Sequence, residues 1–332
     1  MRLDFYIFRT ILLRMKILVT GGFGFIGSSF IKYLNNKGIT NIDICEPKGK
    51  YECKWFNAAD LFYSNIINSD NPYCITNYNY DVIVHLGANS STNQEANSEN
   101  WDNNIQYSNE LIKRFNNHVN KPIFIFASSA ATYGNETSDF SERLNVRPTN
   151  FYGFTKLETE KAINSIDYKN NIYSLRFFNV YGAREAHKAG MSSPIYKWLT
   201  LPNHTIELFE SLNPLFPTGK MARDFVHVDD VCSVIWHCIN SKNKGGTYNV
   251  GSGAASTWEQ VANTIFKTKN INIGSIVYKR MPESLSKHYQ YYTCANLDKL
   301  RNVLNYNQEF LSLEKGIQLT YKEINQLHLP KL

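Results

Sequence analysis

One segment near the start of the chain constrains the fold more than any other. Residues 16–20 read KILVT, an apolar run of strand length, and Gly21, Gly24 and Gly27 follow directly in GGFGFIG. Residues without a Cβ allow a tight turn and a close approach of the backbone to a pyrophosphate, which the N–H groups of the next helix can bind. The segment therefore predicts a strand, a phosphate-binding turn and a helix, which together begin a dinucleotide-binding unit.

The rest of the chain alternates between strand-like and helix-like segments. Further strands are predicted at residues 41–45, 81–86, 123–128 and 172–180, and helices at 101–116, 152–166 and 229–240. Strands that alternate with helices form a parallel sheet covered on both faces, and the right-handed crossover rule makes that sheet doubly wound. The predicted fold is an α/β Rossmann sheet with a smaller C-terminal lobe. We assign residues 15–182 and 224–263 to the dinucleotide-binding domain, and residues 183–223 and 264–332 to a substrate-binding lobe.

Composition excludes several other classes of protein. The 332 residues are 43% hydrophobic with a net charge of +6, and they contain no basic aromatic platform of the kind that binds nucleic acid. No segment approaches the roughly 20 apolar residues of a membrane-spanning helix. Cys232, His237 and Cys238 lie in an apolar helical stretch, and we predict no metal site. Residues 1–14 lack the apolar core of a secretory signal, so we interpret them as an N-terminal extension and expect a cytoplasmic protein.

The residues after the second strand bear on the choice of dinucleotide. Glu46 ends that strand, where a carboxylate would bind the adenosine ribose hydroxyls and favour NAD. Lys48, Lys50 and Lys54 follow closely and could reach a 2′-phosphate, which would favour NADP. The residues alone therefore leave both cofactors open.

A catalytic pair is predicted in the segment 152–166. Tyr152 and Lys156 are four residues apart, so they share one face of the predicted helix. An ammonium beside a phenol favours the phenolate, so we expect a lowered pKa for Tyr152 and proton exchange with a substrate hydroxyl. Ser128 and Ser129 end the strand 123–128, at the edge of the sheet where ligands bind. A hydroxyl there can hydrogen-bond to the reacting oxygen.

These motifs together resemble the extended short-chain dehydrogenase/reductase superfamily and, within it, the ADP-L-glycero-D-manno-heptose 6-epimerases. The resemblance rests on TGGFGFIG (20–27), SSAATYG (128–134) and Y-x-x-x-K, and it runs from Met15 to the C-terminal helix. FFNVYGAREAHKAGMSS (177–193) is its most specific piece, because related sugar epimerases usually lack the His-Lys pair. Further matching segments are GANSST (87–92), WDNNIQYSNEL (101–111), ARDFVHVDDV (222–231) and HYQYYTCANLDKLR (288–301).

The resemblance implies epimerisation at C6″ of an ADP-linked heptose, for lipopolysaccharide core or a related surface glycan. Tightly bound NADP, one per subunit, would take a hydride from C6″ and return it to the opposite face of a 6″-keto intermediate. Tyr152, assisted by Lys156, would handle the proton on one side of the reacting oxygen, and Lys188 would do so on the other. A Lys188 partly desolvated near other cations could act as a base. Ser129 would be the catalytic hydroxyl, and family members form homo-oligomers, often pentamers.

The resemblance also assigns binding residues by matched position. The expected cofactor contacts are Gly21, Gly24, Phe25, Ile26, Gly27, Glu46, Lys54, Leu86, Gly87, Ala88, Asn89, Ser90, Asn103, Tyr152, Lys156, Val180 and Lys188. The expected substrate contacts are Ser129, Asn179, Gly190, Lys197, Phe209, Glu210, Ser211, Leu212, Arg223 and Tyr289. Arg223 is suited to bidentate capture of a diphosphate, and an ion pair with Asp224 is the alternative interpretation of this arginine.

Other functions remain open on the same fold. A 4,6-dehydratase needs an acid–base pair just after the serine, where Ala130-Ala131 stands instead. The main alternative is another nucleotide-sugar epimerase, either a 4-epimerase, which would not need Lys188, or a paralogue for GDP-linked heptose. A silent dinucleotide sensor would typically lose Tyr152 or Lys156, and both are present. Two departures bear on these choices: Glu46-Pro47 stands where the family has Asp-Asn, and Gly190 where it has Ser.

Overall fold

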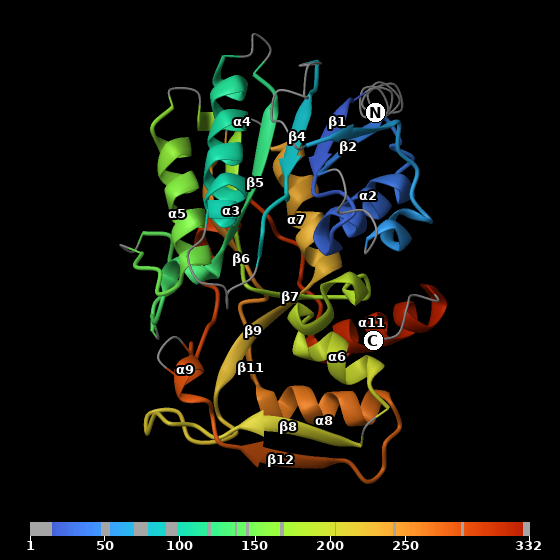
Figure 1. Cartoon of the computed structure of the whole chain (residues 1–332), viewed down its shortest axis with the longest axis vertical. Helices are drawn as coiled ribbons and strands as arrows, with labels where there is room; N and C mark the ends of the chain where they lie inside the picture. Colours follow the sequence, from blue (N-terminus) through green and yellow to red (C-terminus); the bar gives the residue numbers. More distant parts are fainter. Residues whose placement is uncertain are drawn as a thin grey trace.

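A seven-stranded parallel sheet has the strand order β10-β6-β5-β4-β1-β2-β3. It forms the middle layer of the upper half of the molecule in Figure 1. Its strands are β1 (Ile17–Thr20), β2 (Ile42–Glu46), β3 (Asn65–Asn68), β4 (Val82–His85), β5 (Ile123–Ser129), β6 (Ile172–Phe177) and β10 (Gly246–Val250). The chain order runs outward in both directions from β1 and β4, which confirms the predicted doubly wound fold. This computed structural model describes residues 15–47, 54–69, 79–90, 98–117, 121–136, 138–143, 146–166, 169–202, 204–241, 244–286 and 289–327.

Helices cover both faces of this sheet, because the side chains of each strand alternate between two apolar layers. Ile17 and Val19 of β1 pack in the layer that contains α2 (Phe25–Asn36) and α7 (Val228–Asn240). Leu18, between them in sequence, packs in the opposite layer with α4 (Tyr107–Asn116) and α5 (Phe151–Asn164). Figure 1 shows the two helix pairs on either side of the sheet.

The predicted helix 101–116 is longer and less regular than its pattern indicates. It begins as α3 (Ser98–Trp101), continues as a π-helical segment, Asp102–Gln106, and ends as α4. Such π segments accommodate an extra residue in a turn and are frequent at functional sites. Here the Asn104 side chain accepts a hydrogen bond from Asn89 N at 2.8 Å and donates one to Asn89 O at 2.9 Å. The segment therefore anchors the loop that follows β4.

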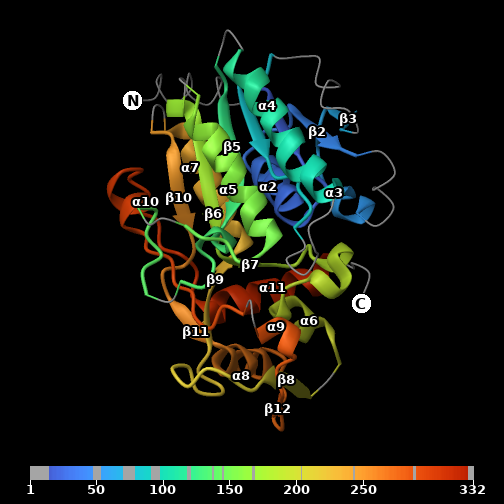
Figure 2. The same ribbon diagram turned by 60° about the vertical axis from the view of Figure 1, so that its left-hand side comes forward.

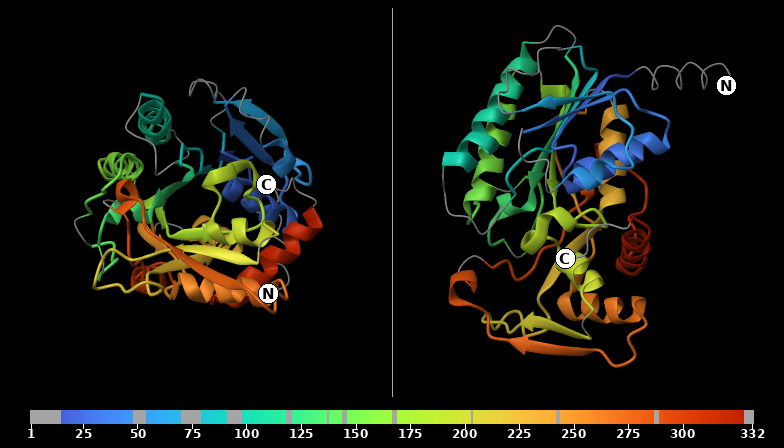
Figure 3. Two further views of the ribbon diagram at one scale, coloured as in Figure 1. Left: turned by 60° about the horizontal axis from the view of Figure 1, so that its bottom comes forward. Right: turned by 45° about the vertical axis from the view of Figure 1, so that its right-hand side comes forward.

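The C-terminal lobe combines two small sheets with helices (Figure 2). One sheet has the order β11-β9-β7 and the other the order β12-β8. Their strands are β7 (Asn179–Tyr181), β8 (Thr205–Phe209), β9 (Ala222–His227), β11 (Ala255–Thr257) and β12 (Ser275–Lys279). The accompanying helices are α6 (Pro194–Thr200), α8 (Trp258–Thr268), α9 (Glu283–Ser286) and α11 (Leu313–Leu327). The short helix α10 (Asp298–Asn302) lies instead beside β10 of the main sheet (Figure 2). Residues of α6, α8 and α11 share one apolar cluster. Figure 3 shows the backbone of sheet and lobe from two further sides.

The chain crosses between sheet and lobe more often than the predicted boundaries imply. The predicted strand 172–180 is two strands, because the chain leaves the main sheet at Phe178, whose ring packs in a separate cluster with Tyr133 and Phe140. The boundary placed at residue 263 falls inside α8, and Leu300 of α10 packs in the core of the main sheet. Within the described residues, no helix is long and apolar enough to span a bilayer.

Candidate active site

A cavity of about 1290 Å³ opens along the carboxyl ends of the central strands. Thr20 of β1, Glu46 of β2 and Ser129 of β5 line it, and so do residues 86–90, which follow β4. Carboxyl ends of parallel strands are the place where open α/β sheets bind ligands. Every residue assigned above to the cofactor lines this one cavity, as does Ser129. Lys48 and Lys50, the other lysines weighed for a 2′-phosphate, lie outside the described residues.

The turn between β1 and α2 has the shape that a pyrophosphate requires. Gly21 has φ +68°, and a Cβ there would lie 2.8 Å from Gly87 Cα. A Cβ on Gly27 would lie 2.2 Å from the carbonyl oxygen of Gly21, so a side chain would push the helix off the strand. The helix N-cap is Gly24, without a capping side chain, so the first N–H groups of α2 face the cavity end of the turn. The residues present therefore fit the diphosphate of a dinucleotide.

Glu46 connects the end of β2 to the phosphate-binding turn. Its side chain is buried, and Oε1 accepts a hydrogen bond from the Phe23 N–H at 2.7 Å. Oε2 lies 3.5 Å from Lys54 Nζ. Glu46 and Lys54 thus form an ion pair on the wall of the cavity. Glu46 is the residue expected at the ribose, and Lys54 the one expected at a 2′-phosphate.

A buried hydrogen-bonded chain supports the loop after β4. His85 Nδ1 lies 2.7 Å from Thr20 Oγ1, and His85 Nε2 lies 2.8 Å from Ser108 Oγ. Burial, with a further contribution from Lys156, lowers the pKa of His85 to about 3, so the imidazole is neutral. Thr20 Oγ1 also accepts a hydrogen bond from Gly87 N at 3.1 Å. These hydrogen bonds hold the loop after β4 against the end of β1, next to the phosphate-binding turn.

The predicted catalytic pair lies at the start of α5, which Asn150 caps by accepting a hydrogen bond from Gly153 N. Tyr152 faces the cavity and is hydrogen-bonded to Ser129. The surrounding protein raises the pKa of Tyr152 to about 12 by desolvation, which the bond to Ser129 only partly offsets. The expectation that Lys156 lowers this pKa is therefore wrong for the chain itself. The ammonium lies 5.7 Å from the centre of the Tyr152 ring.

Lys156 is the residue of this pair whose pKa is shifted towards neutral pH. It is 4% exposed, and Nζ lies 5.0 Å from the centre of the Phe126 ring. Burial lowers the pKa of Lys156 to about 7, against an opposing contribution from Glu160. A lysine at this position can gain or lose a proton near neutral pH and so exchange charge with the neighbouring phenol.

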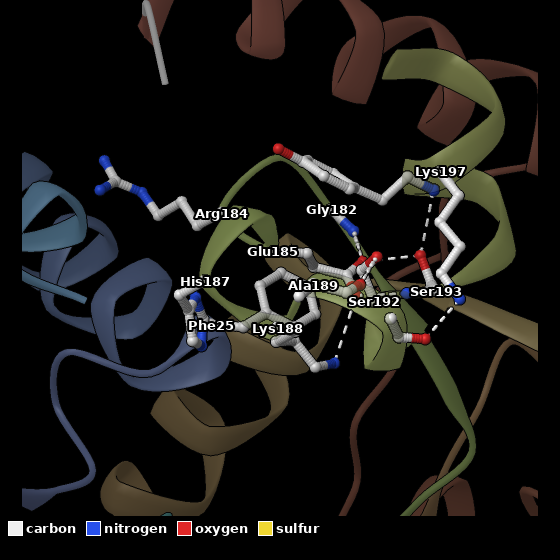
Figure 4. A network of polar contacts seen from close by, with 12 residues as sticks. Phe25, Gly182, Arg184, Glu185, His187, Lys188, Ala189, Ser192, Ser193 and Lys197 are labelled. Carbon is white, nitrogen blue, oxygen red and sulfur yellow. Dashed lines mark hydrogen bonds and ion pairs between the residues drawn. The ribbon is translucent and has the colours of Figure 1, made fainter. Parts of the chain in front are cut away.

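The opposite wall is a 3₁₀ segment, Ala186–Met191, which follows β7 (Figure 4). Lys188 lines the cavity, with Nζ 5.2 Å from the centre of the Phe25 ring and 3.2 Å from Glu185 Oε2. The nearest charged partner of Lys188 is therefore a carboxylate, rather than one of the cations expected around it. His187 also lines the cavity, and burial with nearby Lys54 and Lys188 lowers its pKa to about 4. Its Nδ1 accepts a hydrogen bond from Asn57 Nδ2 at 3.0 Å.

Apart from Ser129, the predicted substrate residues do not line this cavity. They lie in the lobe: Asn179 is exposed on β7, Gly190 has open space around its Cα, and Lys197 Nζ donates to Gly190 O at 2.5 Å. Phe209, Glu210, Ser211 and Leu212 lie at the end of β8 and beyond it.

The Arg223 guanidinium packs between aromatic rings rather than against Asp224. It lies 4.9 Å from the centre of the Tyr289 ring and 5.9 Å from that of Trp258. The carboxylate of Asp224 instead accepts hydrogen bonds from Ser252, Gly253 and Ala295. The two side chains point to opposite faces of β9, as successive residues of a strand do, so the alternative of an ion pair is not observed.

Several residues that line the cavity were not assigned to the cofactor, the substrate or catalysis from the sequence. They include Thr20, Cys45, Pro47, Ser69, Gln106, Tyr107, Phe177, Phe178, His187 and Met191. Thr20, Cys45 and Phe177 lie at the carboxyl ends of strands, so the rule that located Ser129 could have located them too. Gln106 and Tyr107 reach the cavity through the π-helical turn, for which the sequence carried no recognisable signal.

Comparisons with known proteins agree with this geometry. Residues 17–251 match the NAD dependent epimerase/dehydratase family. ADP-L-glycero-D-manno-heptose-6-epimerase of Nitratidesulfovibrio vulgaris (strain DP4) is 34% identical over 316 residues, which cover 90% of this chain and 95% of that protein. The crystal structure of the Helicobacter pylori ADP-L-glycero-D-manno-heptose-6-epimerase is similar with a TM-score of 0.80 at 25% identity, over 95% of this chain and 97% of that one.

A third similarity concerns the fold. The structure of UDP-glucuronic acid 4-epimerase from Bacillus cereus, in complex with UDP-glucuronic acid and NAD, matches with a TM-score of 0.74 at 22% identity, over 94% of this chain and 100% of that one. The glycine turn, the cavity at the strand ends and the match over residues 17–251 lead to one conclusion. The chain belongs to the NAD dependent epimerase/dehydratase family, whose chemistry depends on a nicotinamide dinucleotide.

Proposed function

We propose that the chain is an isomerase that interconverts ADP-D-glycero- and ADP-L-glycero-D-manno-heptose by inverting C6″. The observation that carries the proposal is the convergence of Tyr152 and Lys188 on one cavity from different elements, α5 and the segment after β7. An inversion through a ketone needs a proton-handling group for each orientation of the reacting oxygen. Similarity to an ADP-heptose 6-epimerase over 90% of the chain supports the choice of substrate.

The residues around Tyr152 supply the first proton transfer. The C6″ hydroxyl must lose its proton as a hydride leaves the carbon, and Tyr152 is the acceptor in this proposal. Because burial raises the pKa of Tyr152 to about 12, a neighbour that can take up charge is needed, and Lys156, with its pKa near 7, has that property. Ser129, hydrogen-bonded to the phenol, orients the reacting oxygen. When bound, the dinucleotide supplies the hydride acceptor and, in the second half of the reaction, the hydride donor.

The second half of the reaction uses the opposite wall. After the keto group has turned in the cavity, hydride returns to the other face of C6″, and the oxygen must regain a proton there. Lys188 is placed to donate it, since its ammonium lies on the wall formed by residues 186–191. Over one turnover, Tyr152 with Lys156 gains one proton and Lys188 loses one. Proton exchange with water restores both groups before the next turnover.

We propose NADP as the dinucleotide, one per subunit and tightly bound, with NAD as the alternative. Lys54 lies on the cavity wall, where its ammonium can reach a 2′-phosphate, and this supports NADP. The carboxylate of Glu46 beside it supports NAD. Denaturing the purified protein and identifying the released nucleotide by mass spectrometry decides between them.

The cellular setting follows from the same proposal. ADP-L-glycero-D-manno-heptose would be supplied in the cytoplasm for lipopolysaccharide core or a related surface glycan, by a homo-oligomer, with a pentamer expected from the family resemblance. The predicted substrate residues of the lobe, including Arg223 and Lys197, would bind the ADP-heptose. Analytical ultracentrifugation tests the assembly.

Proton NMR of ADP-D-glycero-D-manno-heptose, incubated with the purified protein without added cofactor, tests the function. Appearance of the L-glycero epimer establishes the reaction and a retained dinucleotide together. No conversion, even with NADP or NAD supplied, contradicts the proposal. GDP-linked heptose and UDP-hexoses then test the paralogue and 4-epimerase alternatives.

A further inference from the structure

Glu185 is a buried carboxylate at the cavity wall, three residues before Lys188. It is 0% exposed, and it accepts hydrogen bonds from Gly182 N, Ser193 N, Ser193 Oγ and Lys188 Nζ at 3.3, 2.7, 2.7 and 3.2 Å. Figure 4 shows its side chain pointing into the middle of this network, whereas Arg184 points away from it. The guanidinium of Arg184 instead pairs with Asp60 at 2.6 Å. Among the described residues, Lys188 is the cation that forms an ion pair with Glu185.

The two carboxylate oxygens have different partners. Oε1 accepts from Gly182 N and Ser193 Oγ, which belong to the two ends of the segment 182–193. Oε2 accepts from Ser193 N and from the ammonium of Lys188. One oxygen therefore closes the segment upon itself, and the other connects the closed segment to the side chain that faces the cavity. Because a carboxylate out of water is costly unless it is paired and hydrogen-bonded, Gly182, Ser193 and Lys188 together stabilise the buried charge of Glu185.

The backbone next to Lys188 is held in a conformation that it would not adopt alone. Ala189 has φ 44° and ψ −123°, a region that residues with a Cβ rarely occupy. Its carbonyl accepts from Ser192 N and Ser192 Oγ at 3.1 and 2.8 Å. Lys197 Nζ also binds the carbonyl of Gly190. These contacts constrain the segment on the C-terminal side of Lys188, and the bonds of Glu185 constrain it on the N-terminal side.

We propose that Glu185 is the positioning residue for Lys188, holding its ammonium on the cavity wall, opposite the catalytic pair of α5. This inference rests on the proposed function, because it assigns to Glu185 the placement of the second proton-handling group of that reaction. The Phe25 ring, in the first turn of α2, also contacts this side chain, with its centre 5.2 Å from the ammonium. A shift of the segment would move Lys188 relative to the cavity without changing any residue of the catalytic pair.

A matched set of variants separates positioning from a structural role. Glu185→Gln keeps the shape and removes the charge that pairs with Lys188. Ser193→Ala is the control, because it removes one bond to Glu185 Oε1 and the cap of α6 while leaving the Lys188 contact in place. We expect kcat of Glu185→Gln to fall roughly 10- to 100-fold through misplacement of Lys188, with little change in KM. Ser193→Ala is expected to lower the melting temperature and to retain the wild-type kcat.

A double-mutant cycle with Lys188→Met adds a second readout. If Glu185 acts through Lys188, the double variant Glu185→Gln/Lys188→Met is no slower than Lys188→Met alone. Losses that multiply would instead show an independent, structural contribution of Glu185 and overturn the proposal. Glu185→Asp, which keeps the charge and shortens the side chain, is the second variant to use if Glu185→Gln does not fold, and we expect an intermediate kcat.

A labelling experiment keeps this inference separate from the proposed substrate. The protein is acetylated with sulfosuccinimidyl acetate, and modification of Lys188 is followed by peptide mass spectrometry, with the exposed Lys267 as internal reference. Loss of the carboxylate that holds the Lys188 side chain on the wall is expected to free that side chain and to speed its acetylation several-fold in Glu185→Gln, and not in Ser193→Ala. Equal rates in wild type and Glu185→Gln would overturn the positioning role. Absence of turnover with ADP-heptose in wild type would overturn only the proposed function.

Discussion

The two walls of the cavity each present a lysine, in opposite surroundings. Lys156, on α5, is 4% exposed and lies over the rings of Phe126 and Tyr152, and burial lowers its pKa to about 7. Lys188, on the segment after β7, has a side chain that is 25% exposed and pairs with the buried carboxylate of Glu185. Among the described residues, Lys156 forms no ion pair, whereas Lys188 pairs with Glu185 at 3.2 Å. These two lysines of the cavity therefore differ in burial and in partner.

Tyr152→Phe is the variant expected to reduce turnover most, because it removes the proton-handling group on α5. It removes the phenolic oxygen while filling nearly the same volume, so the protein is expected to remain folded and to retain its dinucleotide. We expect turnover in the NMR assay to fall by roughly 10²- to 10⁴-fold, as the loss of a general acid–base group does. Absorbance of the nucleotide released on denaturation checks cofactor retention. Wild-type turnover in this variant would remove Tyr152 from the mechanism.

Lys188→Met tests the other wall. We expect turnover to fall by about 10²-fold or more, since the variant lacks the second proton-handling group. The variant also leaves Glu185 without its cation. We expect a loss of about 1–2 kcal/mol in unfolding free energy, less than for a fully enclosed pair because the Lys188 side chain is 25% exposed. Urea unfolding measures this loss, and an unchanged rate with lowered stability would assign Lys188 a structural role alone.

The pH dependence of the unfolding free energy tests the difference between Lys156 and Lys188, because it reports on the buried Lys156. The folded pKa of Lys156, about 7, lies below the 10.5 of an unperturbed lysine, so between these values the unfolded chain binds more protons. Stability therefore rises with pH across this window, and the cost of the buried ammonium is fully present below pH 7. From pH 7 to pH 9 we expect a gain of about 2 kcal/mol from this group. Urea unfolding of wild type and Lys156→Met at both pH values measures it, and an equal pH dependence in the two would contradict the lowered pKa.

Ala189→Gly has the smallest expected effect and probes the strained side of the Lys188 wall. Glycine adopts a φ of 44° without the cost that a Cβ imposes, so we expect a gain in stability of about 1 kcal/mol or less, reduced by the greater freedom of glycine in the unfolded chain. A rise in melting temperature with unchanged turnover is the predicted result. A fall would show that the Ala189 methyl group makes a contact worth more than the strain.

The sequence predicted the α5 wall better than the segment after β7, and the reason is physical. Gly21, Gly24 and Gly27 are needed by backbone geometry, and the strand-to-helix alternation follows from local periodicity, so the sheet and the position of Ser129 could be derived from neighbours in sequence. The raised pKa of Tyr152 and the lowered pKa of Lys156 come from burial by residues distant in sequence, such as Phe126. No spacing rule contains that information.

The segment 182–193 gives a second example of contacts that the sequence does not reveal. The resemblance singled out Lys188, but nothing in R-E-A-H-K says that Glu185 is buried, or that it binds Gly182 and Ser193 as well as Lys188. Arg223 was assigned to the substrate by matched position, and the rings of Trp258 and Tyr289 that surround it come from separate parts of the chain. The candidate functional residues could thus be predicted from the sequence. The side chains that contact them could be identified only from the folded structure.

The repeated crossing of the chain between sheet and lobe has a consequence for synthesis on the ribosome. β10 completes the edge of the main sheet beside β6 only after the chain has passed through β7, β8 and β9, and α10 then packs against β10. Such non-local pairing is slow to form and leaves the incomplete sheet with an open edge. A nascent chain therefore cannot finish the dinucleotide-binding half first and add the lobe afterwards. The two halves must mature together, close to the end of translation, with the unpaired edge of β6 exposed to chaperones until then.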